Sequence, residues 1–210
     1  HRLDAGTSGA LLWAKDYRSY YAVRMQFVAR RVRKEYLCLC LRLLPAAPQH
    51  LASPLHELPD LLPGRPWTVT VERGGRPACT EIRAVVHLSS PQGQGMSLVK
   101  VRLHTGRRHQ IRAHLASLGH PLVGDAAYGA GTQPSWCRRC FLHAAALAVD
   151  ASCGGEPAGA EGMRLEVEAP LPSELLTALA ALTPTDARSR ERRLARLAAP
   201  FGGGSSRAAG

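Results

Sequence analysis

A single carboxylate near the start of the chain is the strongest candidate for chemistry. Asp4 lies in the segment HRLDAGTSG, two residues after Arg2, and the glycines of this segment permit a tight polar turn. A neighbouring arginine favours the ionised form of a carboxylate, which can act as a nucleophile or as a base. Asp4 could equally cap its own turn, and the local sequence does not separate these two interpretations.

A group of arginines farther along the chain indicates an anion-binding surface. Arg107, Arg108 and Arg112 fall within the segment LHTGRRHQIRAHLASLGHP. Guanidinium groups placed so close together repel one another unless anions lie between them, and phosphate oxygens suit their planar shape. The alternative is a solvated basic face.

The histidines and cysteines do not have the spacing of a metal-binding motif. Four histidines surround the arginines, namely His104, His109, His114 and His120. His109 and His114 are five residues apart and therefore off a common helical face. Cys137 and Cys140 form one Cys-x-x-Cys pair, without the second pair that a zinc ribbon needs. We therefore expect no metal site.

The composition narrows the class of protein. A chain of 210 residues, 45% of them hydrophobic, can bury a sizeable core, which excludes a disordered protein. Its 27 Lys and Arg against 16 Asp and Glu give a net charge of +11, which favours a polyanionic partner such as nucleic acid. No apolar run approaches the ~20 residues of a membrane span. The six cysteines are too scattered for a disulfide scaffold, so we expect a reducing, intracellular setting, in the cytoplasm or an organelle such as a mitochondrion or plastid.

Hydrophobic periodicity predicts two long helices and a short one. The first spans 17–33, with an apolar stripe that includes Tyr21, Met25 and Val28. The second spans 105–119 and carries the arginines, and its buried stripe is Ile111, Leu115 and Leu118. The third runs over 173–182 with Ser173 as its N-cap.

Strands outnumber the helices in this interpretation. Residues 35–41 alternate strictly, which places Tyr36, Cys38 and Cys40 on one face and three leucines on the other. Within 80–88, the even-numbered apolar residues are expected to share one face. The remaining strands are expected at 10–14, 67–73, 97–103, 141–149 and 164–168, with a proline-rich surface excursion over 44–66. This order predicts an α+β fold with a central mixed or mostly antiparallel sheet flanked by helices.

Several segments resemble the motifs of the RluA-type RNA pseudouridine synthases. HRLDAGTSGALLWAK is similar to the catalytic motif of that family, and VRKEYLCL is similar to its Lys-x-Tyr strand. The other matching segments are RPACTEIRAV, LHTGRRHQIRAHLASLGHPLVGDAAYG, CFLHAAAL and LEVEAPLP. They occur in family order over 1–182, which implies an N-terminally truncated catalytic domain with the pseudouridine synthase fold, followed by a basic, flexible tail over 183–210. The segment that usually precedes the catalytic motif, and the S4 domain often found before it, are expected to be missing.

The resemblance implies the isomerisation of uridine to pseudouridine in folded RNA. Asp4 would be the catalytic carboxylate, Arg112 would pair with it, and Tyr36 would stack on the extruded base. Arg2 would occupy the space that the uridine leaves. The residues expected to support the catalytic loop or contact RNA are Thr7, Ser8, Arg107, Arg108 and His109.

The same resemblance implies a monomeric enzyme whose partner is ribosomal, transfer or messenger RNA. Substrate and product are isomers, so no cofactor or metal is expected. A second hypothesis is a catalytically inactive RNA-binding module on the same scaffold, and Asp4 would distinguish the two. A glycosidase would need a second carboxylate. Glu35 and Asp125 are the available choices, and Asp125 is more simply interpreted as a turn residue.

Overall fold

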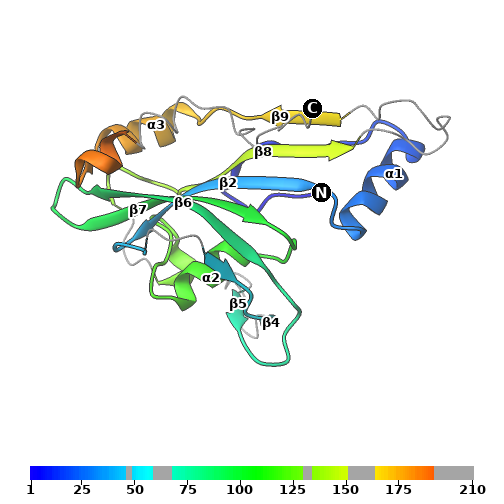
Figure 1. The fold of residues 1–210 in the computed structure, drawn as a ribbon, viewed down its shortest axis with the longest axis horizontal. Helices are drawn as coiled ribbons and strands as arrows, with labels where there is room; N and C mark the ends of the chain where they lie inside the picture. Colours follow the sequence, from blue (N-terminus) through cyan, green and yellow to red (C-terminus); the bar gives the residue numbers. More distant parts are fainter. Residues whose placement is uncertain (46–48, 59–67, 130–133, 151–163, 192–210) are drawn as a thin grey trace, which may run out of the picture.

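The computed structural model describes residues 1–45, 49–58, 68–129, 134–150 and 164–191, which form one large mixed sheet with helices on both faces and a small hairpin below it (Figure 1). The strands of the large sheet are β1 (Ser8–Gly9), β2 (Arg33–Leu41), β3 (Gln49–Leu51), β6 (Thr80–Ser89), β7 (Gly95–Leu103), β8 (Leu142–Asp150), β9 (Arg164–Glu168) and β10 (Thr183–Pro184). Their order is β1-β8-β2-β7-β6-β10, with β3 beside β6 and β9 beside β8. β1 and β8 run parallel and the other described pairs run antiparallel, which confirms the α+β class.

Two helices cover opposite faces of this sheet. The helical elements are α1 (Tyr17–Val28), α2 (Gln110–Ser117), α3 (Ser173–Ala180) and the 3-10 helix η1 (Ala126–Tyr128). α2 packs on one face and α3 on the other, while the hairpin of β4 (Leu55–Leu58) and β5 (Thr68–Val71) packs on α2 (Figure 1). None of the described helices is long and apolar enough to cross a membrane.

The alternation predicted for 35–41 is confirmed in β2. Tyr36, Cys38 and Cys40 pack into the core beneath α2, where Ile111 and Leu115 meet them. The leucines on the other face enter the core beneath α3. β2 is therefore buried on both sides and serves as the central support of the fold.

The single face predicted for 80–88 is wrong. The pairing of β6 with β7 shifts register between Ile82 and Ala84, which is a β-bulge. Because an extra residue reverses the side-chain alternation, Ile82 belongs to the core under α2 whereas Val86 and Leu88 belong to the core under α3.

The predicted first helix exists, but its apolar stripe is not buried. α1 ends at Val28, and none of its residues, all of which the structure describes, is buried. Met25 is 64% exposed, and Tyr21 and Val28 are exposed as well. α1 lies at one end of the sheet (Figure 1) and contacts it through Phe27, which packs against the small core that contains Val32.

The second helix begins later than predicted, at Gln110 instead of Thr105. The side-chain oxygen of Gln110 accepts hydrogen bonds from the Thr105 hydroxyl at 2.7 Å and the Arg107 amide at 3.0 Å, which hold this segment as a loop. His109 has a φ of 49°, which an α-helix does not allow. Leu118, predicted to be buried, is 46% exposed.

Three other local predictions also need correction. Residues 10–14 do not continue β1: the pairing ends after Gly9, and Trp13 is 83% exposed. The excursion over 44–66 contains β3 and β4, whereas 46–48 and 59–66 lie outside the described residues. The N-cap of α3 is Pro172, so that Ser173 is the first helical residue.

The start of the expected tail lies against the sheet. Thr183 and Pro184 pair with β6, and the buried Ser189 accepts a hydrogen bond from the His87 amide at 3.2 Å. Residues 192–210 lie outside the described residues, and the tail there stays a prediction.

Candidate active site

The turn that carries Asp4 is tied to the sheet through β1. The Thr7 amide donates to the Asp4 carbonyl oxygen at 2.9 Å, which closes the turn. Gly9 has a φ of 117°, and a Cβ there would lie 2.1 Å from the carbonyl oxygen of Ala144 in β8. Glycine therefore allows the close approach of the two strands that holds Asp4 at the edge of the sheet.

Ser8 strengthens this attachment from the other side of the turn. The His143 Nε2 atom lies 2.9 Å from the Ala169 carbonyl oxygen, which can only accept, so neutral His143 carries its proton on Nε2. The Ser8 hydroxyl then donates to Nδ1 of His143 at 2.9 Å and accepts from Arg139 at 2.9 Å. Burial is the main cause that lowers the pKa of His143, which favours this neutral form.

Arg112 joins the turn that carries Asp4 to a second acidic residue. One of its terminal nitrogens lies 3.9 Å from Oδ2 of Asp4. Its Nε and Nη2 atoms donate to the two carboxylate oxygens of Asp125, each at 2.7 Å, and the guanidinium lies 5.0 Å from the ring centre of Tyr128. A bidentate ion pair is directional, so Asp125 and Tyr128 fix the position from which Arg112 faces Asp4.

Tyr36 contributes a protonated phenol close to Asp4. Burial, and after it the negative charge of Asp4, raise the pKa of Tyr36 to about 12. The side chain therefore keeps its proton at neutral pH, where it can donate a hydrogen bond and present a ring face.

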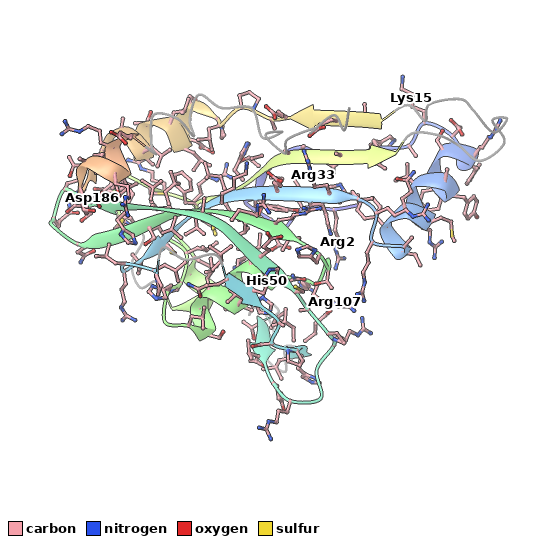
Figure 2. All side chains as sticks on the ribbon, in the orientation of Figure 1. Arg2, Lys15, Arg33, His50, Arg107 and Asp186 are labelled. Atoms are coloured by element: carbon pink, nitrogen blue, oxygen red, sulfur yellow. The ribbon has the colours of Figure 1, made fainter. Side chains whose placement is uncertain are left out.

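A cavity of about 430 Å³ opens beside these groups, within the range of about 300–1,000 Å³ typical of ligand sites. Among the described residues that line it, Asp4 is the one acid. The basic side chains around it are His1, Arg2, Arg24, Lys34, Arg107 and Arg108. Figure 2 labels Arg2 and Arg107 on the same side of the sheet, below β2. Such a lining suits an anionic ligand with one group directed at Asp4.

Lys34 also lines this cavity. Its Nζ atom donates to the carbonyl oxygen of Thr105 at 3.2 Å and lies 5.9 Å from the ring centre of Phe27. Burial lowers the pKa of Lys34 to about 8, so its amine changes charge close to physiological pH.

The residues predicted from the sequence fall into two groups around this cavity. Those that line it are Arg2, Asp4, Thr7, Tyr36, Arg107 and Arg108. Ser8, His109 and Arg112 do not line it and instead support its walls. His109 is 9% exposed, and its Nδ1 atom lies 3.0 Å from the Tyr128 hydroxyl. Burial, and then the charge of Arg112, lower the pKa of His109.

Two residues of the candidate site have contacts that the sequence did not predict. Asp125 does cap a turn, since it accepts from the Ala127 amide at 3.1 Å, but it also holds Arg112. The segment GDAAYG matches the family pattern and contains both Asp125 and Tyr128, so the match could have indicated that these two residues belong to the site. Lys34 is the lysine of the Lys-x-Tyr match and was not assigned a role.

Known proteins share both the sequence and the fold. The RNA pseudouridylate synthase family model matches residues 1–117. An uncharacterized RNA pseudouridine synthase of Bacillus subtilis, YhcT, is 35% identical over 144 residues, which cover 69% of this chain and 45% of that protein. The dual-specificity RNA pseudouridine synthase RluA of Vibrio vulnificus is 36% identical over 152 residues, covering 70% of this chain and 58% of that protein. The structure of human RNA pseudouridylate synthase domain containing 1 superposes with a TM-score of 0.68 and 29% identity, covering 95% of this chain and 80% of that one.

The sheet, its helices and the acid beside a basic cavity thus define a pseudouridine synthase domain. This chain belongs to the RNA pseudouridylate synthase family and within it resembles the RluA type. It spans about half the length of the curated relatives it matches.

Proposed function

We propose that this chain isomerises uridine to pseudouridine in structured RNA, with Asp4 as the catalytic carboxylate. The observation that carries the proposal is the position of Asp4 beside a basic cavity, 3.9 Å from an arginine that Asp125 holds in place. Membership of the family supports the same reaction.

The reaction exchanges one glycosidic bond for another and moves one proton. The C1′–N1 bond of uridine breaks, C1′ joins C5, the proton leaves C5, and N1 takes up a proton. A uridine in a stack cannot reach Asp4, so it must be extruded into the cavity. Asp4 then acts on the uridine, Tyr36 offers its ring and its protonated hydroxyl to the base, and the basic lining receives phosphates.

Tritium release tests the proposal directly. Each conversion in RNA labelled at C5 of uridine releases one tritium to water. We expect release by the unaltered chain from total cellular RNA and a loss of at least about 10³-fold in Asp4→Asn, with RNA affinity retained. Asp16→Asn is the matched control, because Asp16 caps α1 through Ser19 and asparagine can also cap a helix. RNA binding without any release by the unaltered chain would contradict the proposal and favour an inactive RNA-binding module.

A further inference from the structure

Three side chains with metal-binding atoms meet on the sheet outside the cavity. They are His50 in β3, Cys79 one residue before β6, and His104 one residue after β7. Their candidate ligand atoms all lie within 4.8 Å of one another. None of the three lines the cavity. They are 29 and 25 residues apart along the chain, so no sequence motif reveals the group.

The backbone holds these three residues in a defined arrangement. The Cys79 amide donates to the Thr105 hydroxyl at 2.9 Å, and the Cys79 carbonyl oxygen accepts from the His104 amide at 3.1 Å. His50 stands directly opposite Glu81 in the antiparallel pairing of β3 with β6. Hydrogen bonds link all three segments, so their backbone positions are fixed. The three side chains can therefore reach a common ion by rotation about their own bonds.

Glu81 supplies the outer support that metal-binding histidines usually have. Its Oε2 atom lies 2.8 Å from Nε2 of His104, and its Oε1 atom lies 2.8 Å from Arg83. A carboxylate bonded to one ring nitrogen orients the imidazole and leaves the other nitrogen for a metal. The carboxylate and a Cys79 thiolate would together balance the charge of a divalent cation.

We propose that His50, Cys79 and His104 bind a Zn²⁺ ion. One thiolate with two imidazoles is a donor set that suits zinc, with water in the fourth tetrahedral position. Zinc–ligand bonds of about 2.0–2.3 Å place neighbouring donor atoms about 3.3–3.6 Å apart, so the side chains need to close by about 1.5 Å at most. His50 and His104 are exposed and Cys79 is partly exposed, which gives the ion access. The Cys79 thiol releases its proton to solvent as the ion binds.

The ion would join the edge strand β3 to the segment that follows β7. Thr105, next to His104, positions Lys34 through its carbonyl oxygen and Cys79 through its hydroxyl. Because bound zinc stabilises the folded chain, we expect it to raise the melting temperature. The proposal stands apart from the isomerase activity and does not depend on it.

Titration of the reduced, metal-free 210-residue chain with Zn²⁺ and with Co²⁺ tests the site. We expect one equivalent of Zn²⁺ to bind with sub-micromolar affinity, and Co²⁺ to give a thiolate charge-transfer band. Cys79→Ser should abolish this band and weaken Zn²⁺ binding at least about 100-fold, while Glu81→Gln should weaken it about tenfold.

His50→Ala and His56→Ala form the matched pair of variants. Both histidines are exposed and lie in short strands, but His56 is in β4 and outside the group. We expect His50→Ala to weaken Zn²⁺ binding at least about tenfold and His56→Ala to leave it unchanged. Circular dichroism of the metal-free variants shows whether they remain folded. The proposal would be overturned if the unaltered chain did not bind Zn²⁺. It would also be overturned if the folded Cys79→Ser or His50→Ala variant bound Zn²⁺ as tightly as the unaltered chain.

Discussion

At the scale of single residues, the position of Arg112 depends on Asp125. The Asp125 side chain is fully buried and accepts both short hydrogen bonds from Arg112, whereas Asp4 lies at the longer distance of 3.9 Å. Asp125 therefore positions the guanidinium, and in the proposed function Asp4 keeps its oxygens for the uridine. Asp4 lines the cavity, whereas Arg112 and Asp125 are not among its lining residues.

We expect Asp125→Asn to impair turnover more than binding. Without the second carboxylate, Arg112 loses its bidentate partner and no longer faces Asp4 in one orientation. Turnover should fall about 100-fold with RNA affinity nearly unchanged, and the free energy of unfolding should fall by about 3 kcal/mol because a largely buried arginine loses its partner. Single-turnover kinetics separate the turnover rate from RNA affinity, and urea unfolding gives the free energy of unfolding. A variant with weakened RNA binding and normal turnover would refute the positioning role.

Tyr36→Phe tests what the phenol hydroxyl contributes. Phenylalanine keeps the ring face for the base but removes the proton that a raised pKa of about 12 retains. If the hydroxyl assists proton transfer, the turnover rate should fall at least about 100-fold while RNA affinity changes little. Tritium release under saturating RNA measures the rate. Normal turnover in this variant would restrict Tyr36 to stacking.

Lys34 makes stability depend on pH in alkaline solution. Its pKa is about 8 in the folded chain against an ordinary value of 10.5, because burial disfavours the charged amine. Between these values the unfolded chain binds a proton that the folded chain has released, so the free energy of unfolding rises with pH. Below pH 8 both states are protonated, and the cost of burying the charge is present in full.

Lys34→Met should lack this dependence on pH. The difference in unfolding free energy between Lys34→Met and the unaltered chain should shift by about 2–3 kcal/mol from pH 7 to pH 10, in favour of the unaltered chain as the pH rises. Urea unfolding at several pH values measures it, and the other titrating groups cancel in the difference. Parallel pH profiles for the two proteins would show that the amine is solvated.

At the scale of elements, the short parallel pairing of β1 with β8 holds the turn that carries Asp4. Gly9→Ala would force a Cβ against the Ala144 carbonyl oxygen, whereas Gly6, also at positive φ, has nothing within 4 Å of the same position. We expect Gly9→Ala to cost about 3 kcal/mol in unfolding free energy and most of the activity, and Gly6→Ala about 1 kcal/mol. Urea unfolding and tritium release compare them. Equal effects of the two substitutions would mean that the loss of stability comes from the positive φ of each glycine and not from the contact between β1 and β8.

Local sequence predicted the elements whose patterns are complete within one segment. The alternation of β2 and the limits of β9 follow from their own residues. The bulge in β6 and the late start of α2 do not, because they arise from pairing with β7 and from the side chain of Gln110. The apolar stripe of α1 predicted burial, but helical periodicity does not say whether a partner surface exists.

The candidate site also has a part that the sequence predicts and a part that depends on contacts between distant segments. Asp4 and Arg112 were singled out by residue type and spacing, Tyr36 and the roles of all three were implied by motif resemblance, and the structure brings the three together. The bond from Arg112 to Asp125 joins a helix to a turn 13 residues later, and no periodicity relates the two. The approach of His50 to Cys79 depends on the pairing of the short strand β3 with β6. β3 lies in a proline-rich segment, where the sequence does not predict a strand.

At the scale of the whole molecule, the excess of positive charge is distributed unevenly with respect to the cavity. Five arginines and lysines line it, against one acid among its described lining residues. Figure 2 shows Asp186 at the left end of the molecule, away from Arg2 and Arg107. The Arg190 amide donates to the Asp186 carbonyl oxygen at 3.0 Å, so Arg190 lies near that end. A comparison of Arg107 with Arg190 therefore separates local charge from total charge.

RNA affinity should fall linearly with salt on logarithmic axes, because phosphate contacts release counterions. Arg107→Ala should reduce the magnitude of the slope by about 0.7–0.9, the share of one phosphate contact, and weaken binding at low salt. Arg190→Ala removes the same charge from the same total of +11 and should leave the slope unchanged. Fluorescence anisotropy over a range of potassium chloride concentrations measures both variants. Equal reductions of the slope by the two variants would mean that RNA responds to the net charge of the chain. That result would contradict phosphate binding at the cavity.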